Sequence, residues 1–304
     1  MNTNPVIRRL SSAFAHWARS RRRAQGGFSL VEIAVVLIIV GLALGTGIAI
    51  FQARVEQAQI DTTRTRAEAI RQALVAHVAR TYRLPCPAAP GLVSGAAGYN
   101  VEQGGGTAAC TTGSGLVNNV GGAPPLGVSR GTVPCTTLGL TEETCLDAWG
   151  SRFTYFVSNA ATTLTVLTVS GMQGTMTVHR VTPTSAATPL QGLAPTGNQL
   201  NACSTTAGDN SCNLAAVAVI ISHGANQGGG FPPGSAVAMA TGQASIYETP
   251  NFNNDIRFFQ NEYVKDKTNA FDDILVAIPA RDIISTLSQN NTLKDPRVLM
   301  NEQF

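Results

Sequence analysis

The most prominent pattern in the chain is an apolar run from Phe28 to Phe51, in which Glu32 is the only ionisable residue. At about 1.5 Å per residue, a helix of this length spans roughly 36 Å, which is enough to cross a bilayer. The run is longer than the apolar region of a secretory signal peptide, and no convincing small-residue cleavage site follows it. The pattern therefore predicts a retained transmembrane helix over residues 28–51.

The helical pattern continues beyond the apolar run. Residues 52–83 contain neither Gly nor Pro, and apolar residues recur there at the spacing of one helix face. That face comprises Ala67, Ile70, Leu74, Val75, Val78 and Tyr82, with His77 at its flank. Pro85 and Pro87 end the pattern. We therefore expect an amphipathic continuation of the helix over residues 52–84.

Residues 85–304 are expected to form a globular domain with a different pattern. Charged residues are sparse up to Pro250, and β-rich runs alternate with Gly- and Thr-rich loops. Strands are predicted at 152–158, 163–169, 175–181, 214–222 and 274–278, with a short closing helix over 279–287. The continuous apolar run 214–222 is typical of a central buried strand. The expected fold class is α+β, with one antiparallel sheet packed on the amphipathic helix.

The charges before the apolar run orient the chain. Residues 1–27 contain six arginines and no acid, at positions Arg8, Arg9, Arg19, Arg21, Arg22 and Arg23. Basic flanks of membrane helices stay cytoplasmic, so the domain after residue 51 is predicted to be extracytoplasmic. Without these six arginines the formal net charge of +3 becomes −3. The basic character belongs to the leader, and no nucleic-acid partner is predicted.

The chain contains six cysteines, and all of them lie in the predicted extracytoplasmic domain. An even number in that compartment predicts disulfides. Cys135 and Cys145 are close in sequence, as are Cys203 and Cys212, which would leave Cys86 to pair with Cys110. This neighbour pairing is the favoured one, and the other pairings remain open.

Glu32 requires an explanation, because a carboxylate inside hydrocarbon costs several kcal/mol unless it is paired or protonated. It has no basic neighbour three or four residues away in the helix. In an ordinary membrane helix its side chain would extend to the interface. If the chain is cut between Gly27 and Phe28, however, Glu32 becomes the fifth residue and can pair with the new amino group of a neighbouring copy.

The stretch GGFSLVEIAVVLIIVGLALG resembles the prepilin signature of type IV pilins and type II secretion pseudopilins. The resemblance implies a leader over residues 1–27 that prepilin peptidase removes after Gly27. It also implies N-methylation of Phe28 and a role for Glu32 in assembly with other pilin subunits. The implied location is the inner membrane, with the C-terminal domain in the periplasm, followed by a filament.

Three further fragments are similar to parts of major pseudopilins: LDAWGSRFTYFVS, VAVIISHGANQGGG and FDDI. Together with LPCPA, they also resemble larger pilin-like proteins of Gram-negative bacteria. Some major pseudopilins bind calcium with the corresponding loops. Here Asn226 and Gln227 stand where acids would be expected, and Asp272 and Asp273 are the candidate oxygen ligands. No cofactor is therefore assigned.

An enzymatic interpretation finds little support. Ser222, His223 and one of Asp272 or Asp273 have the residue types of a hydrolase triad. Adjacent side chains on a strand end point to opposite faces, however, and no G-x-S-x-G motif is present. Asp147, Glu142 and Glu143 are interpreted as loop caps. No catalytic residue is predicted.

The sequence thus predicts a pilin or pseudopilin subunit. Removal of the leader leaves 277 of the 304 residues, which is large for a major subunit and favours a minor one. The alternative is a pilus-tip adhesin or a DNA-binding pilin, and a membrane-anchored periplasmic hydrolase is a more remote one. The pattern does not distinguish a type IV pilus from a type II secretion system.

Overall fold

The fold is taken from a computed structural model. It describes residues 28–106, 108–111, 127–163, 176–179, 201–203, 212–235, 237–239, 245, 247–252, 256–265 and 270–289. The chain divides into two compact units, Met1–Glu56 and Gln57–Phe304, which are described separately. The predicted leader lies outside the described residues, as does the predicted strand 163–169 apart from its first residue.

The first unit contains the start of helix α2, Leu30–Thr81. The backbone N–H of Glu32 donates to the Ser29 hydroxyl over 3.2 Å, so Ser29 caps the first turn in an S-x-x-E arrangement. Large apolar side chains at the start of this helix are exposed, including Leu30 at 86%, and Phe28 just before it is 76% exposed. An acidic residue in the first turn also complements the helix dipole.

In the described part of the chain, no helical segment combines the length and the apolar character that a bilayer crossing requires. The transmembrane helix over residues 28–51 stays a prediction.

The second unit contains the rest of α2, and its apolar stripe is confirmed. Ala67, Ile70, Leu74 and Val78 are fully buried. Tyr82 is an exception, because the helix ends at Thr81 and Tyr82 adopts a left-handed conformation with φ of 58°. The side chain of Tyr82 therefore leaves the stripe and is 37% exposed.

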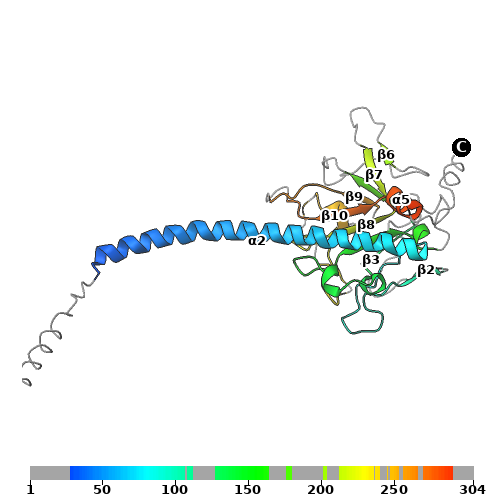
Figure 1. Ribbon diagram of the computed structural model, residues 1–304, viewed down its shortest axis with the longest axis horizontal. Coiled ribbons are helices and arrows are strands. Elements are labelled where there is room, and N and C mark those ends of the chain that lie inside the picture. Colours follow the sequence, from blue (N-terminus) through cyan, green and yellow to red (C-terminus); the bar gives the residue numbers. More distant parts are fainter. Residues whose placement is uncertain are drawn as a thin grey trace, which may run out of the picture. The chain divides into compact units, whose positions relative to one another are not determined.

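Two four-stranded sheets follow, where the sequence predicted one (Figure 1). The central sheet is antiparallel, in the order β10-β8-β4-β3, and consists of β3 (Val128–Thr132), β4 (Thr154–Ser158), β8 (Ala218–Ser222) and β10 (Ile274–Ile278). The second sheet has the order β6-β7-β5-β9 and consists of β5 (Met176–His179), β6 (Asn201–Cys203), β7 (Cys212–Ala216) and β9 (Arg257–Phe259). Within it, β5 and β9 are parallel. A small ribbon pairs β1 (Gly104–Gly105) with β2 (Ala108–Cys110).

The central sheet separates two apolar cores, because successive side chains of a strand point to opposite faces. Tyr155 and Val157 of β4 pack in one core with Ile70 and Leu74 of α2. Phe156 packs in the other core with residues of the second sheet, and its ring meets that of Phe258 edge-on at 4.8 Å. The second unit is therefore an α+β assembly of three layers: helix, central sheet and second sheet.

The predicted central strand 214–222 is one of the corrections. The apolar run bends at Val217, so that β7 belongs to the second sheet and β8 to the central sheet. Val217 donates to Ile278 O, and its own carbonyl accepts from Ser158 N. The run is apolar on both sides of the bend because both sheets are buried there, which is why the sequence pattern conceals the bend.

The remaining helices are short. They are α3 (Cys135–Leu138), the 3-10 helices η1 (Glu142–Cys145) and η2 (Asn159–Thr162), α4 (Thr249–Phe252) and α5 (Ala280–Gln289). The last corresponds to the predicted closing helix, and β10 has the predicted bounds 274–278.

Two of the three expected disulfides are present. Cys86 is bonded to Cys110, and Cys135 is bonded to Cys145. Cys203 and Cys212 are direct partners in the antiparallel register of β6 and β7, so the backbone places the third pair opposite each other. A bond between them stays a prediction.

Candidate metal centre

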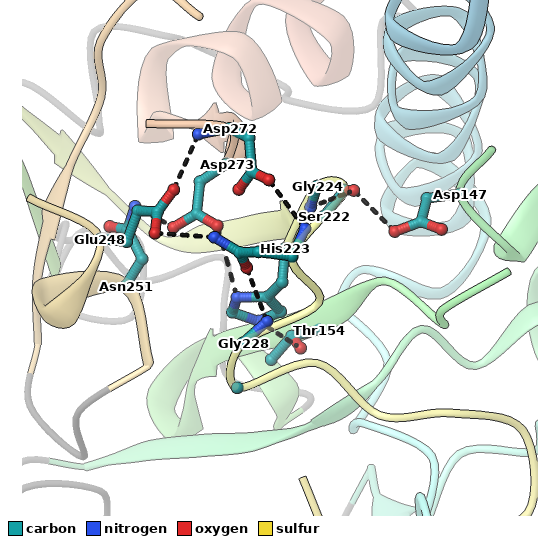
Figure 2. Close-up of polar contacts among 12 residues, drawn as sticks. Asp147, Thr154, Ser222, His223, Gly224, Gly228, Glu248, Asn251, Asp272 and Asp273 are labelled. Atoms are coloured by element: carbon teal, nitrogen blue, oxygen red, sulfur yellow. Dashed lines mark hydrogen bonds and ion pairs between the residues drawn. The ribbon is translucent and has the colours of Figure 1, made fainter. Parts of the chain in front are cut away.

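The richest polar region of the second unit lies where β8 ends beside the start of β10. Ser222 is the last residue of β8 and pairs with Ile274 of β10. His223 follows Ser222, and Asp272 and Asp273 precede β10. Ser222 and His223 point to opposite sides, as predicted, so two separate polar groups form around this strand end (Figure 2).

The first group is built on Asp147 and is called the Asp147 pocket. The Ser222 hydroxyl donates to Asp147 Oδ2 over 2.8 Å, while the backbone N–H groups of Trp149 and Ser151 donate to Oδ1 over 3.0 and 2.9 Å. Burial raises the pKa of the Asp147 carboxyl, and these hydrogen bonds act in the opposite direction. Both carboxylate oxygens thus have donors, and the predicted role of Asp147 as a loop cap is confirmed.

The second group begins at His223, which is fully buried. Its Nε2 lies 3.1 Å from the Thr154 hydroxyl of β4, and its Nδ1 lies 3.6 Å from Asp273 Oδ1. Nδ1 makes no hydrogen bond to any described residue. Thr154 is buried as well, so this acid–imidazole–hydroxyl row is closed to solvent.

Three buried carboxylates complete the second group, which is called the acidic cluster. One carboxylate oxygen each of Glu248, Asp272 and Asp273 lies within 4.8 Å of the others. Figure 2 shows their side chains converging from the segment before α4 and from the start of β10. Glu248 accepts from the backbone N–H groups of Asp272 and Ser245, each over 2.8 Å.

Within the acidic cluster, Asp272 has the least favourable surroundings for its charged form. Its Oδ2 accepts from Asn226 N over 2.8 Å, whereas its Oδ1 is buried without a hydrogen-bond partner among the described residues. Burial, followed by the hydrogen bond and charge of Glu248, raises the pKa of Asp272 to about 8. Asp273 is better supported, because Asn251 Nδ2 donates to its Oδ2 over 2.8 Å.

Glycines allow the 223–230 loop to approach these acids. Gly224 has a φ of +57°, and a Cβ atom there would lie 2.4 Å from Asp272 O. Gly229 has a φ of +86°, and a Cβ atom there would lie 2.4 Å from Phe252 Cβ. The Gly-rich stretch therefore serves close packing of the loop against Asp272 and α4.

A calcium site formed by the 223–230 loop is not supported by the side chains that the loop presents. Asn226 donates from its backbone N to Asp272 and from Nδ2 to Glu248, and its Oδ1 accepts from Gly228 N. Gln227 donates to the carbonyl of Trp149. The loop thus offers mainly N–H groups to the acids, whereas calcium requires oxygen ligands.

The other predicted residues belong to other parts of the chain. Phe28 and Glu32 belong to the first unit, and Gly27 lies outside the described residues. Glu142 accepts from the Tyr99 hydroxyl and Glu143 pairs with Arg66 over 2.6 Å, so both join η1 to other segments. Ser222 donates to Asp147 and not to His223, so these residues do not form the hydrolase triad that the sequence had given little reason to expect.

Glu248 was not among the predicted site residues. One feature of the sequence could have identified it: it is an acid in a span with few charged residues. Glu248 meets Asp272, 24 residues later, because of the path of the chain between α4 and β10. The spacing of the two residues in the sequence does not reveal this contact.

Residues 22–48 match the family model described as the prokaryotic N-terminal methylation motif. No curated protein and no solved structure matches the chain.

Proposed function

We propose that the chain is a minor subunit of a type IV pilus or of a type II secretion pseudopilus. The N-terminal methylation motif over residues 22–48 supports a pilin- or pseudopilin-like precursor that is processed by prepilin peptidase. The minor role, the position in a filament and the absence of an enzymatic activity are parts of the proposal.

The observation that carries the proposal is the placement of this motif at the start of α2. The proposed cleavage after Gly27 leaves Phe28 and Ser29 ahead of the helix, and Glu32 lies in its first turn. The Glu32 side chain is exposed, so it is accessible to a neighbouring subunit. Its proposed partner is the amino group of Phe28 in that subunit.

The exposed apolar face of the first unit supports the same interpretation. Large apolar side chains within residues 28–42, and those of Ile50 and Phe51, are exposed in this unit. Contiguous exposed apolar surface of this kind is typical of a membrane or protein contact. In the proposal, lipid covers it before assembly and neighbouring subunits cover it afterwards.

The first test is N-terminal mass spectrometry of the protein from its native membrane. We expect the chain to begin at methylated Phe28. Retention of the leader, or a start well inside α2, would refute the pilin assignment.

The second test separates assembly from helix capping, because Glu32 is part of an S-x-x-E cap. Glu32→Gln keeps a residue that is suited to this cap but removes the charge, and we expect loss of co-purification with sheared filaments. Ser29→Ala removes the hydroxyl that accepts from Glu32 N and retains the carboxylate. This control should assemble nearly normally.

Glu56→Gln is the matched control for the same substitution on the same helix. A filament yield that falls equally for Ser29→Ala and Glu32→Gln would assign Glu32 to capping instead. Wild-type yields for Glu32→Gln would remove its assembly role.

A further inference from the structure

His77 is a buried titratable residue that belongs to neither the Asp147 pocket nor the acidic cluster. It lies on α2 beside the apolar stripe and is only 5% exposed. Its Nε2 atom is buried without a hydrogen-bond partner among the described residues. A buried polar atom without a partner costs free energy, and a charged imidazole, in which both ring nitrogens are donors, costs more. The folded chain therefore favours the neutral form of His77.

The charged groups around His77 do not offset this cost. Among the described residues, Glu102, Arg83 and Arg80 act on it electrostatically. Burial lowers the pKa of His77 below its ordinary value of 6.5; Glu102 opposes this shift, whereas Arg83 and Arg80 add to it. Both carboxylate oxygens of Glu102 already accept from the Arg83 guanidinium over 2.7 Å. A charged His77 would therefore have to share the one nearby acid with Arg83.

The ion pair of Arg83 and Glu102 also attaches the segment that follows the helix. The two side chains are 13% and 17% exposed, so their contact is largely shielded from water. Glu102 Oε2 accepts from Cys86 N over 3.2 Å, and Cys86 is bonded to Cys110. Gly105 permits this close packing, because a Cβ atom there would lie 2.8 Å from Arg83 Nη1. Segment 84–106 is thus held to the end of α2 by groups that act on His77.

We propose that this junction is acid-sensitive, and that uptake of one proton by the His77 imidazole weakens the attachment of segment 84–106 to the end of α2. The proton comes from solvent and converts the neutral imidazole to an imidazolium. The imidazolium has an N–H at Nε2 without an acceptor, and its charge competes with Arg83 for Glu102. The inference does not rest on filament assembly, since Glu32 lies in the other unit.

The direction of the pH effect follows from the lowered pKa. The folded state holds the His77 proton more weakly than the unfolded state, whose pKa is near 6.5, so the unfolded state takes up the proton first as pH falls. The stability that neutral His77 contributes is complete above pH 6.5 and is lost as pH drops from there towards the folded-state pKa. For one such group, the unfolding constant rises by up to about tenfold between about pH 7.5 and about pH 5.5.

The first test measures His77 directly, in the full-length mature chain in detergent. The protein is labelled at histidine, and the imidazole of His77 is assigned through its backbone resonances and titrated by NMR. Its midpoint should lie clearly below 6.5. A midpoint at or above 6.5 would overturn the proposal. Because this measurement uses the wild-type chain, it stands even if a variant fails to fold.

The second test compares chemical unfolding of variants at the same two pH values. His77→Phe keeps a ring but removes the titration, so the rise in the unfolding constant at the lower pH should shrink by at least about threefold. Thr81→Val is the matched control, because it removes the hydroxyl that donates to His77 O in the same turn and changes no titratable group. This control should be destabilised equally at both pH values. Wild-type pH dependence in His77→Phe would contradict the proposal.

The third test locates the effect by hydrogen exchange with mass spectrometry. After correction for the intrinsic pH dependence of exchange, segment 84–106 should exchange faster at the lower pH in the wild type but not in His77→Phe. The central sheet serves as the internal reference and should be unaffected. Equal acceleration of the segment and the sheet, or none in the segment, would rule out an acid-sensitive junction.

Discussion

The Asp147 pocket and the acidic cluster lie on opposite sides of the same strand end, yet their buried carboxylates have different sets of hydrogen-bond donors. In the Asp147 pocket a single carboxylate meets three donors, from Trp149, Ser151 and Ser222. In the acidic cluster three carboxylates converge, and Asp272 Oδ1 has no described donor.

The number of hydrogen-bond donors around each buried carboxylate distinguishes the two groups. A buried carboxylate that caps a loop has its hydrogen bonds supplied by local backbone, as Asp147 has. The acidic cluster instead leaves Asp272 Oδ1 and His223 Nδ1 buried without a hydrogen-bond partner among the described residues. The same Asp→Asn substitution is therefore expected to change the stability of the fold in opposite directions in the two groups.

The largest effect is expected from Asp147→Ala. Removing this carboxylate leaves the N–H groups of Trp149 and Ser151 and the Ser222 hydroxyl without their acceptor. We expect a loss of about 2–4 kcal/mol in the free energy of unfolding. Urea unfolding followed by fluorescence measures it, because Trp149 is one of two tryptophans and the other, Trp17, lies in the proposed leader. Wild-type stability would show that the pocket is not structural.

Gly224→Ala should have the next largest effect, and it acts on the acidic cluster. The new Cβ atom would lie 2.4 Å from Asp272 O, at a residue with φ of +57°. We expect a cost of about 1–3 kcal/mol in the free energy of unfolding. Gly139→Ala is the control, because Gly139 also has a positive φ but has nothing within 4 Å of the Cβ position. An equal loss of stability in both variants would contradict the close approach.

Asp272→Asn tests whether the substitution changes stability in opposite directions in the two groups. It replaces a buried carboxyl group whose ionisation is costly, since burial and Glu248 raise its pKa to about 8, and it should stabilise the fold by about 1 kcal/mol. Asp147→Asn should instead be slightly destabilising, since an amide nitrogen cannot accept from the Ser222 hydroxyl. Chemical unfolding of both variants in the presence of a chelator measures the two changes in stability. Loss of stability in both would mean that the acidic cluster carries no surplus charge.

The smallest effect concerns pH. Burial raises the pKa of Asp147 above its ordinary value of 3.8, so the folded state binds this proton more tightly than the unfolded state. The stability associated with this proton is present below pH 3.8 and is lost as pH rises through the raised pKa. Stability curves of wild type and Asp147→Asn should therefore diverge with rising pH. Parallel curves would place the Asp147 pKa at its ordinary value.

Several features were predictable because they are local. Helix α2, Leu30–Thr81, was expected from the apolar run and the periodicity that follows it, and its end shortly before Pro85 was expected from proline chemistry. The strand 274–278 and the pairings of Cys86 with Cys110 and of Cys135 with Cys145 are confirmed. In each case the pattern and the structure it predicts occupy the same short stretch of chain or follow from neighbour pairing.

The errors concern long-range arrangement. The run 214–222 was predicted as one strand, but it contributes β7 to one sheet and β8 to the other. Strand β3 was missed, because VSRGT lacks a clear alternation and is buried through pairing with β4. Burial on both faces of a sheet, which only packing decides, removes the alternation that sequence analysis relies on.

By itself, the sequence determined the processing and methylation motif, the amphipathic stem and the opposite orientation of Ser222 and His223. These depend on residue order and on the fixed repeat of helices and strands. Only the tertiary structure decided that Glu248 meets Asp272 and Asp273, and that His223 faces Asp273 at 3.6 Å. Such a convergence requires the chain to return to one place from distant positions, and packing of the whole domain, rather than local preference, determines that return.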